Sequence, residues 1–135
     1  MGKTAEAEIR VRFADTDADG GVYHANYLTY FASGRHEILR GAGIDLNRLA
    51  REDGLRFVVV EATCRYRAVA YFDDVLIVRS QVERLGNSSV VLAYEVVRPE
   101  TDGETLIASG TTAQVFIDKE NKAVPMPQWI REALS

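Results

Sequence analysis

The succession of hydrophobic periodicities along the chain constrains the fold more than any other feature of the sequence. Residues 6–13 alternate polar and apolar side chains, which is typical of a half-buried strand. Its apolar face, predicted to be buried, consists of Ala7, Ile9, Val11 and Phe13. Residues 25–42 then change to helical spacing. The buried stripe of this helix is predicted to contain Leu28, Phe31, Ile38 and Ala42, with Tyr27 and Leu39 beside it.

Four segments rich in β-branched and aromatic residues follow the helix and alternate with turn residues. They cover residues 56–70, 75–85, 89–98 and 105–118. Asp45 can cap a short helix between the long helix and these strands, and two prolines precede a C-terminal helix at residues 128–134. Because the turns between consecutive strands are short, we expect antiparallel pairing.

These elements predict a single α+β domain over residues 1–135, with the order βαββββ and a short C-terminal helix. The long helix has about 18 residues and is about 27 Å long, enough for a five-stranded antiparallel sheet to curl round it. Gly34 inside this helix indicates a close approach to the sheet. Such a sheet leaves exposed edge strands, which a second subunit can cover. We therefore expect a homodimer with a continuous sheet, or a tetramer of such dimers.

Charge and cysteine content restrict the classes of partner and compartment. The chain has 16 Lys and Arg against 20 Asp and Glu, a net charge of −4, which argues against a nucleic-acid or anionic-membrane surface. Cys64 is the only cysteine, so no intrachain disulfide can form, as in proteins of reducing compartments. No signal peptide or apolar stretch of about 18 residues is present. We expect a soluble cytoplasmic protein without a membrane span.

An acidic, glycine-containing loop joins the first strand to the long helix. Asp15, Asp17, Asp19 and Gly20 match the start of an EF-hand calcium loop, but the position of the bidentate glutamate holds Asn26. A strand precedes the loop, where an EF-hand has a helix. With two histidines and no cysteine pair, the sequence predicts no metal site.

The same acids could serve a turn or a catalytic site. Asp and Gly are typical of turns, so Asp15 is interpreted as a structural Asx-turn residue and Asp19 as a solvated one. Alternatively, Asp17 could face backbone N–H groups at a helix that starts near His24, where an oxyanion would be stabilised. The spacing alone leaves both interpretations open.

The run from Asp15 to Tyr27, Asp-Thr-Asp-Ala-Asp-Gly-Gly-Val-Tyr-His-Ala-Asn-Tyr, closely resembles the signature of hotdog-fold acyl-CoA thioesterases. The nearest types are the 4-hydroxybenzoyl-CoA thioesterases and the acyl-CoA thioesterases associated with the Tol–Pal system. The element order is similar to that fold over nearly the whole chain. The resemblance implies a hotdog fold and hydrolysis of a small acyl- or aroyl-CoA thioester to a carboxylic acid and CoA. This sequence departs from the common pattern of the family at Asp19 and Gly21, which leaves the acyl preference open.

Roles for individual residues follow from the same resemblance. Asp17 would be the catalytic carboxylate, as nucleophile or as general base, and backbone N–H groups near Tyr23 and His24 would hold the thioester carbonyl. The resemblance also places Tyr27 at the substrate, while a direct role for the His24 side chain stays open. The candidates for contacts to CoA are Arg65, Arg67, Arg84, Asn87 and Ser88. No cofactor is implied, since CoA is part of the substrate, and the active site would lie between subunits.

Two other functions remain open for the same scaffold. One is a thioesterase or dehydratase acting on acyl-carrier-protein thioesters, and the other is a non-catalytic acyl-CoA-binding or scaffolding protein. The sequence favours the thioesterase, because it retains both the Asp17 carboxylate and the residues at the helix start. His36 is predicted to be a surface or interface residue, and Cys64 to be a packing residue without a partner that would lower its pKa.

Overall fold

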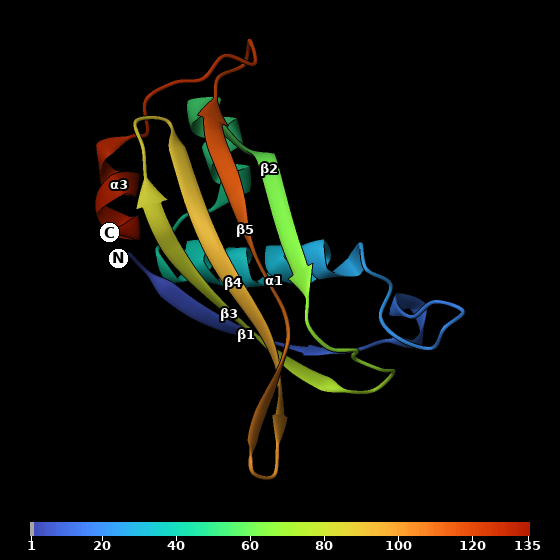
Figure 1. Ribbon diagram of the computed structural model, residues 1–135. Helices are drawn as coiled ribbons and strands as arrows, with labels where there is room; N and C mark the ends of the chain where they lie inside the picture. The colour runs from blue at the N-terminus through green and yellow to red at the C-terminus, as the bar shows by residue number, and fades with distance from the viewer. Residues whose placement is uncertain (1) are drawn as a thin grey trace.

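Five antiparallel strands in the order β1-β3-β4-β5-β2 form one sheet in the computed structural model, which describes residues 2–135 (Figure 1). The strands are β1 (Thr4–Arg10), β2 (Arg56–Tyr66), β3 (Val75–Leu85), β4 (Ser89–Glu100) and β5 (Gly103–Ile117). The helices are α1 (Asn26–Gly41), α2 (Leu46–Arg48) and α3 (Gln128–Leu134), with single turns η1 (Phe13–Asp15) and η2 (Leu49–Asp53). The predicted α+β architecture and βαββββ order are confirmed.

Helix α1 packs against one face of the sheet, and the hydrophobic core lies between them (Figure 1). Gly34 marks the closest approach, because a Cβ at this position would lie 2.1 Å from Ser80 Oγ and 2.8 Å from Val78 Cγ1. The close approach expected from the sequence is confirmed. The buried stripe of α1 is rotated relative to the prediction and consists of Tyr27, Tyr30, Phe31, Gly34, Ile38 and Leu39. Leu28 is 41% exposed, so its predicted burial is wrong.

The first strand ends earlier than its alternating pattern predicts. β1 stops at Arg10, and η1 redirects the chain before the pattern is complete. As a result Phe13 is 77% exposed, and its predicted place in the core is wrong. The Asp15 carboxylate accepts the Arg12 N–H at 3.0 Å and thereby closes the turn that ends the strand.

Strand β2 forms one edge of the sheet, because among the strands of residues 2–135 it pairs only with β5. A register shift between Val59 and Glu61 interrupts the pairing, and the intervening Val60 is 61% exposed. β2 therefore presents an unpaired and partly apolar edge. Within residues 2–135, none of the helices has both the length and the apolar character needed to cross a membrane.

Two loops lie side by side beyond the sheet and form a lobe, residues 11–25 together with residues 67–74 (Figure 1). The Val22 N–H donates to Ala70 O at 2.9 Å, and Asp73 N–H donates to Val11 O at 2.9 Å. The lobe connects β1 to α1 and β2 to β3. The acidic loop is thus held between the start of α1 and the end of β2.

Candidate active site

The acidic loop is a tight hairpin. Thr16 and Val22 form an antiparallel bridge, and the Asp17 N–H donates to Gly21 O at 3.0 Å. Gly20 has φ +90°, which favours glycine. The Asp17 side chain is exposed, and its Oδ1 accepts the Asp19 N–H at 2.9 Å. The Asx turn therefore belongs to Asp17 rather than to Asp15, and within residues 2–135 the second Asp17 carboxylate oxygen accepts no hydrogen bond.

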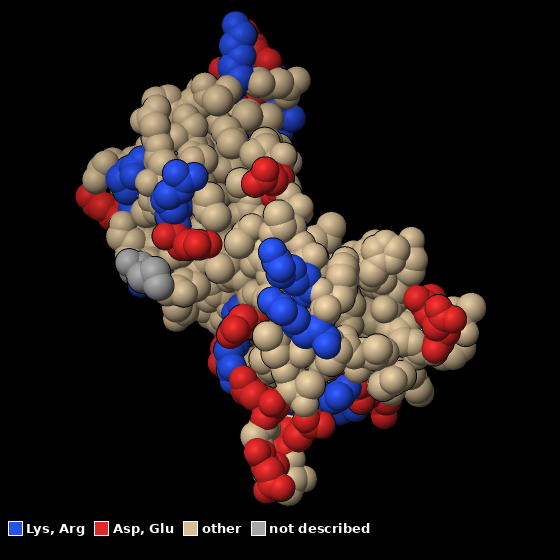
Figure 2. All heavy atoms as spheres, in the orientation of Figure 1, with Lys and Arg blue, Asp and Glu red and all other residues tan. Residues whose placement is uncertain are grey.

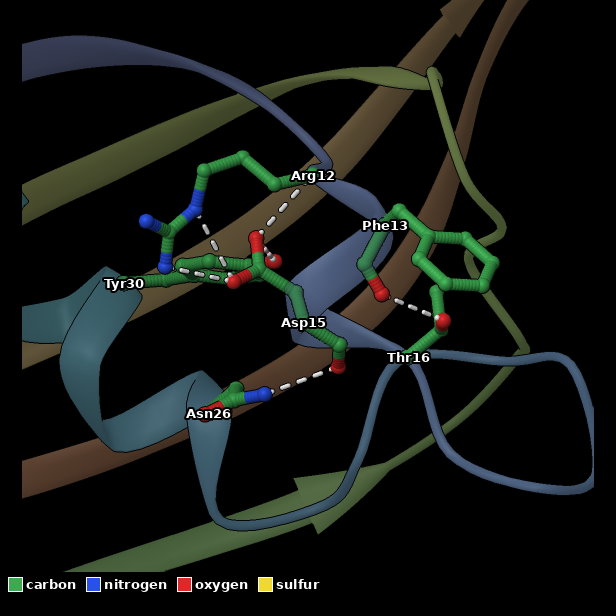
Figure 3. Close-up of polar contacts among 6 residues, drawn as sticks. All are labelled: Arg12, Phe13, Asp15, Thr16, Asn26 and Tyr30. Carbon is green, nitrogen blue, oxygen red and sulfur yellow. Dashed lines mark hydrogen bonds and ion pairs between the residues drawn. The ribbon is translucent and has the colours of Figure 1, made fainter.

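Asp15 has the structural role predicted for it, but by a different arrangement (Figure 3). Its carboxylate is buried and accepts the Arg12 guanidinium at 2.7 Å and the Tyr30 hydroxyl at 2.9 Å, in addition to the Arg12 N–H. Burial alone would raise the pKa of Asp15. The hydrogen bonds from Arg12 and Tyr30 outweigh burial and lower this pKa below its usual value. The same bond to Asp15 and burial raise the pKa of Tyr30, which stays a donor.

The start of α1 offers unpaired backbone donors. The Tyr23 N–H is occupied, since it donates to Asp15 O at 2.9 Å. Within the described part of the chain, no acceptor lies in hydrogen-bonding reach of the His24 and Ala25 N–H groups. The N-cap residue Ala25 provides no side-chain cap, and the first turn holds no acid. Of the two oxyanion donors predicted from the sequence, His24 is therefore the available one, at the positive end of the helix.

Aromatic side chains surround this helix start. The His24 ring is exposed and lies 4.5 Å from the Tyr23 ring and 6.2 Å from the Tyr66 ring, centroid to centroid. The Tyr66 hydroxyl donates to His24 O at 3.0 Å, so β2 fixes the peptide group next to the available N–H. Tyr27 is buried against the rings of Tyr30 and Tyr66, and burial raises its pKa to about 12.

The end of β2 extends this surface with a strip that faces the α1 side. Cys64 pairs with Gly110, and a Cβ at Gly110 would lie 2.8 Å from the Phe31 ring, so this face of the strand points towards α1. Burial raises the pKa of Cys64, which agrees with the predicted packing role. Tyr66 is half-exposed on the same face. The strip therefore offers a mostly apolar surface beside the helix start.

The candidate CoA-binding residues form two separate groups in one subunit. Arg65 lies opposite Ser109 at the C-terminal end of β2, and Arg67 follows it; both are exposed. Arg84, Asn87 and Ser88 belong to the β3–β4 hairpin, which Phe116 ties to the opposite end of β2 through the 3.0 Å bond from its N–H to Ser88 O. Figure 2 shows basic side chains both near the C-terminal end of β2 and near this hairpin. Within residues 2–135, Arg65, Arg67 and Arg84 form no ion pair.

The remaining candidates lie where no reaction is indicated. His36 is exposed on α1, as predicted, and burial together with Arg35 and Arg40 lowers its pKa. No group of three metal-ligating side chains occurs within residues 2–135. Sequence reasoning missed the contacts of Arg12, Tyr30 and Tyr66, because their bonds to Asp15 and His24 depend on the folded chain.

The structure thus combines a helix lying on a five-stranded antiparallel sheet with an exposed carboxylate on the loop before an uncapped helix start. Residues 11–134 match the Thioesterase-like superfamily, and the chain belongs to this family. The acyl-CoA thioesterase YbgC of Haemophilus influenzae is 35% identical over 118 residues, covering 87% of this chain and 83% of the relative.

Solved structures agree with this assignment. The 1,4-dihydroxy-2-naphthoyl-CoA thioesterase Slr0204 from Synechocystis superposes with a TM-score of 0.88 at 26% identity, covering 97% of this chain and 95% of that chain. A mutant 4-hydroxybenzoyl CoA thioesterase complexed with 4-hydroxybenzoyl CoA gives a TM-score of 0.90 at 21% identity, over 98% of this chain and 99% of that chain. At 21% identity, the similarity to the 4-hydroxybenzoyl CoA thioesterase concerns the fold alone. The hotdog-type fold and the family resemblance predicted from the sequence are confirmed.

Proposed function

We propose that the protein is an acyl-CoA thioesterase that hydrolyses a small acyl- or aroyl-CoA thioester to a carboxylic acid and CoA. Family membership and the activities named for the relatives support this proposal. The observation that carries it is the presence, within eight residues of the chain, of the Asp17 carboxylate, exposed on a tight hairpin, and of the available His24 N–H at an uncapped helix start. A carboxylate can act as nucleophile or base in thioester hydrolysis, and a free backbone N–H can stabilise the oxyanion.

In the proposed reaction the His24 N–H binds the thioester carbonyl oxygen as it becomes negative. If Asp17 is the nucleophile, its carboxylate attacks the carbonyl carbon, the CoA thiolate leaves, and water hydrolyses the resulting acyl anhydride. If Asp17 is a general base, it takes a proton from a water molecule that attacks the same carbon, the C–S bond breaks, and the proton passes to the departing CoA thiolate. In both cases the developing oxyanion needs a fixed donor, and one such donor contributes about 3 kcal/mol to transition-state stabilisation.

We assign the CoA phosphates to the exposed arginines. Arg65 and Arg67 lie near the Tyr66 end of β2, whereas Arg84, Asn87 and Ser88 lie at the other end of the sheet. One CoA molecule would meet both groups if the second group came from a partner subunit. No cofactor besides the CoA of the substrate enters this proposal. The single cysteine, Cys64, agrees with a cytoplasmic location, which stays a prediction.

The unpaired edge of β2 supports the proposed homodimer. Val59 and Val60 are 47% and 61% exposed on this edge, where an uncovered strand would invite uncontrolled pairing. Pairing of β2 with its copy would extend the two sheets into one and place the two lobes at the interface. Size-exclusion chromatography with light scattering tests this, and a monomer at micromolar concentration would contradict it.

Release of free thiol from a panel of acyl-CoAs, from short aliphatic to aromatic acyl groups, tests the proposed activity. We expect turnover of at least one substrate and a clear ranking among them. Matching thioesters of acyl carrier protein are the comparison, and a preference for them would redirect the proposal. Binding of acyl-CoA without thiol release from any substrate would indicate the non-catalytic alternative.

A further inference from the structure

Asp15 is the residue of the acidic loop with the most contacts, although the proposed chemistry does not use its side chain. The residue is 4% exposed, and its carboxylate accepts four hydrogen bonds from two residues, Arg12 before η1 and Tyr30 on α1. Its backbone oxygen accepts the Tyr23 N–H at 2.9 Å and the Asn26 side-chain amide at 2.8 Å. Asp15 thus joins the end of β1, the hairpin and the first two turns of α1 (Figure 3).

These bonds occupy the Tyr23 N–H and leave the His24 and Ala25 N–H groups as the available backbone donors at the helix start. Because Asp15 O takes the Tyr23 N–H, that group cannot serve an oxyanion. The next N–H, that of His24, is left without an acceptor within residues 2–135, and its neighbouring carbonyl is fixed by Tyr66. The peptide groups before and after the one that carries the His24 N–H are therefore both held by hydrogen bonds.

We infer that Asp15 is a positioning residue: its buried carboxylate fixes its own backbone oxygen on Tyr23 and thereby leaves the His24 N–H as the oxyanion donor. The inference rests on the proposed function for its kinetic consequence, but the arrangement itself can be tested without catalysis. Since an oxyanion donor acts mainly in the transition state, displacement of His24 lowers kcat more than it changes KM. A displacement of about 1 Å can lower the rate by about 100-fold.

The first test compares Asp15→Asn with Asp45→Asn. Asp45 is the control, because its carboxylate, like that of Asp15, closes a turn by accepting backbone N–H groups, here those of Asn47 and Arg48 at 2.9 and 3.1 Å, but it caps α2. We expect Asp15→Asn to lower kcat by about 10- to 100-fold with KM within about twofold, and Asp45→Asn to leave both within about twofold. A folded Asp15→Asn variant with kcat within about twofold of the wild type would overturn the inference.

A substitution at Arg12 and a measurement of hydrogen exchange make the test independent of whether Asp15→Asn folds. The Arg12 side chain is 74% exposed, so Arg12→Gln should fold even if Asp15→Asn does not, and we expect it to lower kcat by about 3- to 10-fold. Unchanged kcat in a folded Arg12→Gln variant would count against the inference. Amide hydrogen exchange by NMR reports the arrangement without any substrate: the Tyr23 N–H should be protected in the wild type and lose at least about tenfold of that protection in Asp15→Asn.

The two readouts separate this inference from the proposed function. Protection of Tyr23 that depends on Asp15, without turnover of any thioester, would retain the arrangement and reject the enzyme. Turnover by the wild type with equal Tyr23 protection in wild type and Asp15→Asn would retain the enzyme and reject the inferred role of Asp15.

Discussion

Replacement of Gly34 by alanine tests how tightly α1 is seated on the sheet that positions the site. A Cβ at Gly34 would lie 2.1 Å from Ser80 Oγ and 2.8 Å from Val78 Cγ1, both closer than real Cβ contacts. Gly41 lies in the same helix, and a Cβ there would meet nothing within 4 Å. Gly41→Ala is therefore the matched control, because both changes remove a glycine from α1 but only one inserts an atom into a filled space.

The expected magnitudes follow from two opposing effects. Replacing glycine by alanine in a helix stabilises it by up to about 1 kcal/mol. Inserting a methyl group into a packed interface costs about 1–3 kcal/mol. Gly41→Ala should therefore raise the free energy of unfolding by up to about 1 kcal/mol, whereas Gly34→Ala should lower it by about 0–3 kcal/mol. Gly41 is the last residue of α1 and gains at most as much from alanine as Gly34 does, so the opposite direction of the two changes identifies the packing cost at Gly34.

Urea denaturation followed by far-UV circular dichroism measures both variants, at one protein concentration because a homodimer makes apparent stability depend on concentration. A shift in midpoint without a change in slope would show a change in stability alone. Adding Ser80→Ala should recover part of the loss in Gly34→Ala, because it removes the Oγ at 2.1 Å but leaves Val78. Equal stabilisation by Gly34→Ala and Gly41→Ala would refute the close approach of α1 to β3.

Three further predictions concern the lobe and the sheet edge. Tyr66→Phe removes the hydroxyl that holds His24 O and should lower kcat several-fold, while Tyr71→Phe, also at a half-exposed tyrosine, should not; steady-state kinetics decide. The Asp15 pKa is lowered by folding, so its contribution to stability is present above about pH 4 and lost as pH falls through the folded value. Urea midpoints should therefore differ between wild type and Asp15→Asn at pH 7 and converge below about pH 4; a constant gap would contradict this. Val60→Lys on the β2 edge should weaken the proposed dimer by light scattering, and an unchanged dissociation constant would exclude that edge.

The sequence predicts which helices and strands are present better than it predicts where they end and which of their faces is buried. β3 was predicted with its observed bounds, because alternation and flanking turns agree there. The burial of Phe13 and Leu28 was predicted wrongly for different reasons. The alternating pattern continues past Arg10 although a turn closed by Asp15 has already ended the strand, and the face of α1 is decided by the sheet on which it packs.

The candidate site, too, has features that the sequence predicts and features that it does not. The loop, the helix start and the proposal of Asp17 as catalytic residue can be inferred from residues close together in sequence. The sequence does not show which of the carboxylates in the loop is buried. The burial of Asp15 depends on Tyr30, a helix residue whose hydroxyl reaches Asp15 only after folding. The choice of His24 over Tyr23 as available donor likewise depends on the bond from Tyr23 N–H to Asp15 O. Neither the bond from Tyr30 nor the bond from Tyr23 can be inferred from the local sequence pattern.

The most direct test of this account is the rate of thiol release by Asp17→Asn, compared with Asp19→Asn, on the best substrate of the wild type. Both side chains are exposed on one hairpin, and the amide oxygen of asparagine at position 17 can still accept the Asp19 N–H, so both variants should fold. If the Asp17 carboxylate attacks the substrate or activates water as proposed, Asp17→Asn should lower kcat by at least about 100-fold. Asp19→Asn should stay within about threefold of the wild type. A folded Asp17→Asn variant with kcat within about threefold of the wild type would contradict the proposed role of Asp17.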